Sequence, residues 1–163
     1  MKKKERLTAY QYLLKDKLSG DKNRELIALL KDIKLAGRQV AKELNSATLN
    51  NTIGEMYGKK NTHGEDVKKL DIVANNLFIQ SLENGGNCAG IVSEEKEKVL
   101  IFNNEVSRNS KYLVCIDPLD GSTNIDVNVP VGTIFSVLKR PSLGEKTFSK
   151  DFLQIGSKQV AAG

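Results

Sequence analysis

Apolar side chains recur at helical spacing in the first half of the chain. Over residues 22–44 they return every three or four positions, as Leu26, Leu29, Leu30, Ile33, Ala36, Val40 and Leu44. This period places them on one face of a helix, and Asp21 is suited to cap its first turn. The same kind of spacing predicts a second helix over 65–82, ended by the Asn- and Gly-rich residues 84–87, and a shorter helix over 7–18.

The segment between the two longer helices, residues 45–64, is polar and contains Gly54, Gly58 and Gly64. A connection of about 20 residues is unusually long for a compact domain, and such loops are more often functional than merely connecting. We therefore expect residues 45–64 to form a long loop.

Four apolar runs in the second half of the chain predict strands over 88–93, 99–102, 112–116 and 133–138. The third and fourth runs are largely apolar, as is typical of strands covered on both faces. Helices followed by strands predict an α/β fold, a layered sandwich of helices on a mixed sheet. The final residues resemble the start of another apolar element, so we expect residues 1–163 to be a truncated domain.

Composition narrows the classes of function. Apolar residues make up 39% of the 163-residue chain and charged residues 28%, as in an ordinary globular protein. No apolar run approaches the ~20 residues that span a membrane, so we expect a cytoplasmic protein without a membrane partner. The net charge of +5 suits an anionic small molecule. The basic residues form no stripe interleaved with aromatic side chains, which argues against nucleic-acid binding.

The cysteines and the histidine favour none of the common nucleophilic mechanisms. Cys88 and Cys115 each lie in an apolar stretch, so we expect two buried thiols rather than a disulfide framework or a zinc site. His63 is the single histidine and lies in the polar loop, which argues against a histidine-based triad. The candidate chemistry therefore lies among the acidic residues.

Acidic residues gather where predicted strands meet loops. The run over 112–116 leads directly into Asp117-Pro118-Leu119-Asp120-Gly121-Ser122-Thr123-Asn124. Two carboxylates three residues apart can converge on one site, and carboxylate and carbonyl oxygens are the ligands that magnesium prefers. Gly121 lets the backbone approach a ligand, and the amides that follow it suit a phosphate group. An Asp-rich turn is the alternative, but the whole string is more specific than a turn requires.

Two further acidic groups are candidates for the same site as this string. Glu94 and Glu95 follow the predicted strand over 88–93. Paired glutamates are common on solvated surfaces, yet a second carboxylate pair at a strand end can complete a magnesium site. Glu65 opens the predicted second helix, where an acidic side chain also favours the helix electrostatically, and Asp71 follows further along. Spacing alone does not make Asp71 catalytic.

Carboxylates arranged in this way suit the hydrolysis of a phosphate ester. Attack by water at phosphorus builds negative charge on the equatorial and leaving oxygens, which magnesium neutralises while it lowers the pKa of the attacking water. A nearby carboxylate can then take the proton. The sequence shows no Walker-type lysine loop that would indicate another route.

The string over 117–124 resembles the signature of the lithium-sensitive, magnesium-dependent phosphatase superfamily. Its extension through Asp126 is similar to class I fructose-1,6-bisphosphatases in particular, as are residues 67–71, 93–95, 111–112, 131–135 and 160–163. The resemblance runs from about Leu26 to the end of the chain. It implies the sugar phosphatase fold and hydrolysis of the 1-phosphate of fructose 1,6-bisphosphate, with Mg²⁺ as cofactor and gluconeogenesis as the pathway.

The resemblance also implies a role for each site residue. Magnesium would bind to Glu94, Asp117, the Leu119 carbonyl, Asp120 and Glu65. The attacking water would be positioned and deprotonated by Asp71 and Glu95. The phosphate being removed would be held by Asp120, Gly121, Ser122 and Thr123.

Chains of this family are longer, so the resemblance places another metal-binding glutamate and the sugar-binding residues in an absent carboxy-terminal half. It implies a homo-oligomer, which is a tetramer in the full-length family. It also suggests AMP as a ligand, through matches at Ser19-Gly20, Lys111-Tyr112 and Lys139 or Arg140. Two alternatives stay open: a sedoheptulose-bisphosphatase or related sugar-phosphate phosphatase, and an inactive fragment that only binds metal or anion or assembles. Alone, the 163 residues are expected to be inactive.

Overall fold

The computed structural model describes residues 24–49, 56–60, 66–127, 129–141 and 145–163. The predicted helix over 7–18, Glu65 and His63 lie outside these residues. The α-helices are α2 (Arg24–Leu49), α3 (Lys69–Gly85) and α4 (Glu105–Arg108). The strands are β1 (Met56–Lys60), β2 (Asp66–Lys68), β3 (Gly90–Ser93), β4 (Leu100–Ile101), β5 (Tyr112–Asp120), β6 (Gly132–Lys139) and β7 (Gln159–Ala162). Short 3₁₀ helices are η2 (Ser122–Val127), η3 (Ser149–Phe152) and η4 (Gly156–Lys158).

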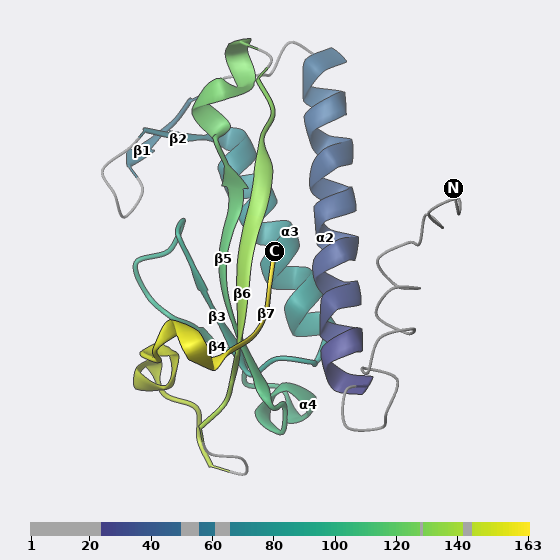
Figure 1. The fold of residues 1–163 in the computed structure, drawn as a ribbon. Coiled ribbons are helices and arrows are strands. Elements are labelled where there is room, and N and C mark those ends of the chain that lie inside the picture. The colour runs from purple at the N-terminus through teal and green to yellow at the C-terminus, as the bar shows by residue number, and fades with distance from the viewer. Residues whose placement is uncertain (1–23, 50–55, 61–65, 128, 142–144) are drawn as a thin grey trace, which may run out of the picture.

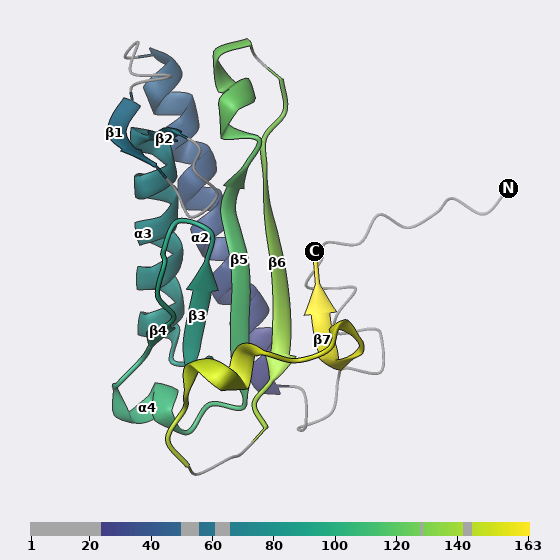
Figure 2. The ribbon, with the colours of Figure 1, turned by 90° about the vertical axis from the view of Figure 1, so that its left-hand side faces the viewer.

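Helices α2 and α3 pack against each other on one face of the larger sheet (Figures 1 and 2). Leu29 and Phe78 are fully buried between these layers and belong to the same core cluster as Val114 of β5. Successive side chains of a strand point to opposite faces, so Leu113 lies on the other side of the sheet. There it forms a smaller cluster with Phe152 of η3. The sheet is thus covered by two long helices on one face and by a thinner layer on the other.

Strand order β4-β3-β5-β6-β7 places β5 at the centre of the five-stranded sheet. Strands β3 and β5 are parallel, with Ser93 opposite Ile116, and the other neighbouring pairs are antiparallel. The predicted α/β architecture with a mixed sheet is confirmed. Because parallel strands end at the same edge of a sheet, the residues that follow Ser93 and Ile116 meet there.

The long loop expected over 45–64 is wrong in part. Helix α2 continues through residues 45–49, and β1 lies within the rest of the segment. Strand β1 pairs with β2 in a separate antiparallel sheet, with Met56 opposite Lys68. This pairing removes residues 66–68 from the helix expected to begin at 65, so α3 begins at Lys69.

The strand predictions are confirmed at their centres and shifted at their ends. Strand β3 begins two residues later than the predicted 88–93, and β5 continues past Ile116 to Asp120. Cys88 is buried as expected, and this burial raises the pKa of its thiol to about 12. Cys115 is only partly buried, because it lies on the face of the sheet with the thinner cover. No helix in the described ranges combines the length and apolar character needed to cross a membrane.

Candidate active site

The centre of the candidate site is a pair of carboxyl groups, one directly after the end of β3 and the other within the last four residues of β5. Strand β3 ends at Ser93, and the next amide, that of Glu94, donates to the carbonyl oxygen of Ile116 at 3.1 Å. This bond continues the parallel register by one residue and brings Glu94 beside Asp117. Their side chains share a hydrogen bond, which requires one of the two to hold a proton.

The surroundings of Asp117 disfavour its charged form. Burial raises the pKa of Asp117 to about 7, and the hydrogen bond and negative charge of Glu94 act in the same direction. The amide of Leu119 donates to Asp117 Oδ1 at 3.1 Å and partly opposes the shift, whereas the charge of Asp120 adds to it. Crowded carboxyl groups of this kind are typical of a cation site or of a catalytic pair.

The residues after Asp117 form a bulge rather than the loop that the sequence suggested. Asp117 lies opposite Ile134 and Asp120 opposite Gly132, so β5 contains one more residue than β6 between these two pairs. The Thr133 hydroxyl donates to the Pro118 carbonyl at 2.9 Å and fixes the bulge. Pairing with β6 therefore keeps the string in the sheet, while the extra residue redirects its side chains.

A tight turn follows the bulge. Gly121 has a φ of 78°, a left-handed conformation that favours glycine, and its carbonyl accepts from the Asn124 amide at 2.8 Å. Helix η2 then begins at Ser122. The turn thus places the backbone of Gly121, Ser122 and Thr123 next to Asp120, and the phosphate cradle at these residues stays a prediction.

Asp71 lies in the first turn of α3 and is 3% exposed. One turn later Asn75 is fully buried, and its Oδ1 accepts a hydrogen bond from Ser93 Oγ at 2.8 Å. Ser93 Oγ in turn accepts from the Glu95 amide at 3.3 Å. These two bonds fasten the helix that carries Asp71 to the strand end that carries Glu95.

Asn75 and its bond to Ser93 were not predicted from the sequence. A signal was available, because Asp71 and Asn75 are four residues apart and therefore share one face of a helix. That face also carries Ala74 and Phe78, which are buried in the core. Two polar residues among buried apolar ones indicate a network or a site.

The structure brings together some of the proposed metal ligands. In the described ranges, no three carboxylate, histidine or cysteine side chains are grouped so as to hold an ion. Glu94 and Asp117 are in contact, Asp120 is exposed on the same bend, and Glu65 lies outside the described residues. The available donors are hard oxygens, and the Glu94–Asp117 pair would lose its mutual repulsion beside a cation, so the residues fit magnesium.

Comparison with known proteins identifies the family of this chain. The model of the family "Fructose-1-6-bisphosphatase, N-terminal domain" matches residues 8–163. The structure is also similar to the crystal structure of Leishmania major fructose-1,6-bisphosphatase in holo form, with a TM-score of 0.84 and 28% sequence identity. That match covers 98% of this chain and 48% of the Leishmania chain, so the chain spans about half the length of that protein. The chain belongs to the fructose-1,6-bisphosphatase family, and its residues correspond to the family's N-terminal domain.

Proposed function

We propose that the chain forms the metal-binding half of a fructose-1,6-bisphosphatase, a magnesium-dependent phosphoric monoester hydrolase. The reaction is hydrolysis of the 1-phosphate of fructose 1,6-bisphosphate to fructose 6-phosphate and phosphate, a step of gluconeogenesis in the cytoplasm. The observation that carries the proposal is the contact between Glu94, directly after β3, and Asp117 of the parallel strand β5, with the turn at Gly121 beside them. The family assignment independently favours the same chemistry.

The proposed magnesium ligands are Glu94, Asp117, the Leu119 carbonyl, Asp120 and Glu65. When bound, magnesium supplies positive charge that stabilises the phosphoryl and leaving oxygens and acidifies the attacking water. The hydrogen bond from the Leu119 amide holds Asp117 in one orientation. The proton that Asp117 shares with Glu94 must leave before both carboxylates can act as ligands.

The remaining residues bind and orient the reacting groups. We assign to Asp71 and Glu95 the positioning and deprotonation of the attacking water. Asp120 and the backbone of Gly121, Ser122 and Thr123 hold the phosphate being removed. The bonds from Ser93 to Asn75 and from the Glu95 amide to Ser93 fix the separation of the elements that carry the two water-directed carboxylates.

The sugar and its second phosphate would be held by residues of the rest of the protein. The proposed assembly is a homo-oligomer, specifically a tetramer.

AMP is a further proposed ligand, and we favour Lys139 over Arg140 as its basic contact. Lys139 is exposed, whereas Arg140 is 3% exposed and its guanidinium is engaged with backbone carbonyls. Lys111 forms an ion pair with Glu25 at 2.6 Å, so AMP would have to compete with Glu25 for Lys111. Ser19-Gly20 lies outside the described residues.

The test is phosphate release by the full-length protein, with fructose 1,6-bisphosphate and sedoheptulose 1,7-bisphosphate compared at saturating magnesium. We expect the fructose substrate to have the higher kcat/KM, and EDTA to abolish its turnover. A preference for sedoheptulose 1,7-bisphosphate would identify the related phosphatase. An Asp117→Ala variant that retains near-normal turnover at saturating magnesium would remove Asp117 from the mechanism.

A further inference from the structure

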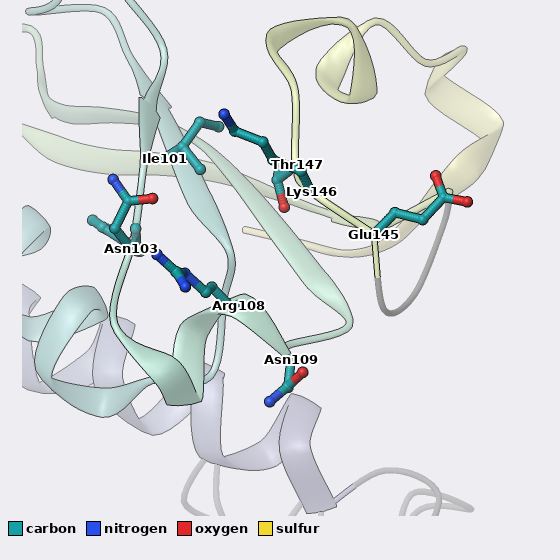
Figure 3. A pocket seen from close by; sticks show the side chains of 8 residues that line it. Ile101, Asn103, Arg108, Asn109, Glu145, Lys146 and Thr147 are labelled. Carbon is teal, nitrogen blue, oxygen red and sulfur yellow. The ribbon is translucent and has the colours of Figure 1, made fainter.

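A hollow lies at the opposite end of the sheet from Glu94 and Asp117. It has a volume of about 480 Å³ and lies between the β4–α4 segment and residues 145–147 (Figure 3). It is lined by Ile101, Phe102, Asn103, Arg108, Asn109, Glu145, Lys146 and Thr147. Cavities of about 300–1,000 Å³ are typical of small-molecule sites. The strand register separates the two regions, because Lys139 pairs with Tyr112 at this end of β5 and Ile134 with Asp117 at the other.

The charges around this cavity are unbalanced. In Figure 3 the Arg108 side chain extends toward Asn103 and that of Lys146 toward β4, whereas the Glu145 carboxylate points away. Neither Arg108 nor Lys146 forms an ion pair with any residue of the described ranges. Two cations therefore face a hollow whose single lining carboxylate is directed elsewhere.

A third cation lies directly behind the cavity wall. Arg140 is 3% exposed, and its guanidinium donates to the Arg108 carbonyl at 2.6 Å, to the Ser110 carbonyl at 3.0 Å and to the Glu145 carbonyl. All three acceptors are neutral, and Arg140 Nε has no hydrogen-bond partner in the described part of the chain. Burying a cation without a counter-ion is costly, so an anion nearby would stabilise this arrangement.

We propose that this cavity binds a small organic anion that carries a phosphate or carboxylate group. Arg108 and Lys146 would contact the oxyanion, with Asn103 and Thr147 as neutral donors. Phe102, which is 1% exposed, and Ile101 provide an apolar wall for the rest of the molecule. The site goes beyond the proposed catalytic function and shares no lining residue with the carboxylate cluster or with the proposed AMP contacts.

The test is calorimetric titration of the full-length protein with inorganic phosphate and, separately, with citrate. The variant Arg108→Gln/Lys146→Gln removes both cavity cations, whose side chains are exposed. The control Lys34→Gln/Lys42→Gln removes the same charge from two exposed positions of α2. Circular dichroism verifies that both variants fold, and kcat is expected to be unchanged in both.

We expect wild type and control to bind at least one of the two anions at a site in the cavity. In the cavity variant this binding should be lost, or its affinity should be lower by a factor of about ten or more. Calorimetry counts sites per chain, so phosphate binding at the catalytic turn appears as a separate event common to all three proteins. A response to phosphate alone indicates a phosphorylated ligand, and a response to citrate alone indicates a carboxylate ligand. Equal site numbers and affinities in the cavity variant and the control, or no such site in wild type, overturn the proposal.

Discussion

Ser93 Oγ donates a 2.8 Å hydrogen bond to Asn75 Oδ1, and both residues are buried. The bond joins α3 to the end of β3, so it links the two elements that carry Asp71 and Glu95. Asn75→Ala leaves the Ser93 hydroxyl buried without this acceptor, which we expect to lower the free energy of unfolding by about 1–3 kcal/mol. We also expect a lower kcat with little change in KM, because the carboxylates proposed to direct the attacking water shift, whereas the turn proposed to hold the phosphate does not.

A double-mutant cycle separates this bond from general destabilisation. Asn75→Ala/Ser93→Ala removes both partners, so it should be less destabilised than the sum of the two single variants, with a coupling of about 0.5–1.5 kcal/mol. Urea denaturation provides the energies, and steady-state kinetics of the full-length protein provide the kcat–KM split. Strict additivity in both measurements would contradict a direct role for the bond.

Asp117 should give the metal-free protein an unusual dependence of stability on pH. Burial and Glu94 raise the pKa of Asp117 from 3.8 to about 7, so the folded state keeps a proton that the unfolded state has lost. This contribution is complete below the unfolded pKa and is lost as pH rises through the folded pKa. We expect stability in EDTA to fall by about 1–2 kcal/mol between pH 5 and pH 8, since partial exposure screens the effect.

Asp117→Asn removes the titrating group while it keeps the size of the side chain. In EDTA this variant should lose most of the fall in stability between pH 5 and pH 8 and be more stable than wild type at pH 8. Thermal melts at the two pH values measure both effects. Asp151→Asn is a suitable control, because that residue lies in η3, away from the carboxylate pair. A wild-type protein that becomes more stable as pH rises over this range would refute the assignment.

Magnesium affinity should depend on the same proton. If both Glu94 and Asp117 become ligands, the proton they share must be released on binding. We expect apparent magnesium affinity to weaken by about tenfold for each pH unit below about 7, the pKa of Asp117, and to level off above it. Calorimetry in two buffers of different ionisation enthalpy measures the released proton directly. A pH-independent affinity between pH 5.5 and 8 would exclude the shared proton from the metal site.

Gly85 is expected to be intolerant of a side chain. A Cβ at this position would lie 2.1 Å from Asp32 Oδ2, the atom that accepts a 2.8 Å hydrogen bond from Asn87 Nδ2. Gly85→Ala must therefore displace the Asp32 carboxylate and break this link between α2 and the end of α3, at a cost of about 1–3 kcal/mol. Gly156→Ala is the matched control, because nothing lies within 4 Å of a Cβ there. Equal melting temperatures for the two variants would show that Asp32 adjusts freely.

Features of the fold that depend on neighbouring residues could be predicted from the sequence. The helical period of apolar residues in α2 and the buried runs of β3 and β5 depend on neighbouring positions, so the layers and the centres of these strands could be predicted, whereas their ends were shifted. The convergence of Glu94 with Asp117 then followed from their places directly after two apolar runs. The parallel register of β3 and β5 is what brings them together.

Features that depend on distant partners could not be predicted. Residues 56–60 are Met-Tyr-Gly-Lys-Lys, which lack the apolar alternation of a strand, and only pairing with β2 makes them one. The bulge after Asp117 similarly depends on the register of β6. The bond between Asn75 and Ser93 joins residues 18 apart in sequence, on a helix and a strand whose packing fixes their distance.

We expect the 163 residues expressed alone to be far less active than the full-length protein. This chain matches 48% of the Leishmania protein, and the residues proposed to hold the sugar and its second phosphate belong to the other part. Orientation of a bound substrate can contribute ~7–11 kcal/mol to lowering a barrier, so the shorter protein should have negligible turnover of fructose 1,6-bisphosphate. Ile134, Ile155 and Val160 are 54%, 68% and 42% exposed, which favours association of the shorter protein. Phosphate release and light scattering test the two expectations, and activity within tenfold of the full-length protein, a difference of only ~1.4 kcal/mol, would contradict the first.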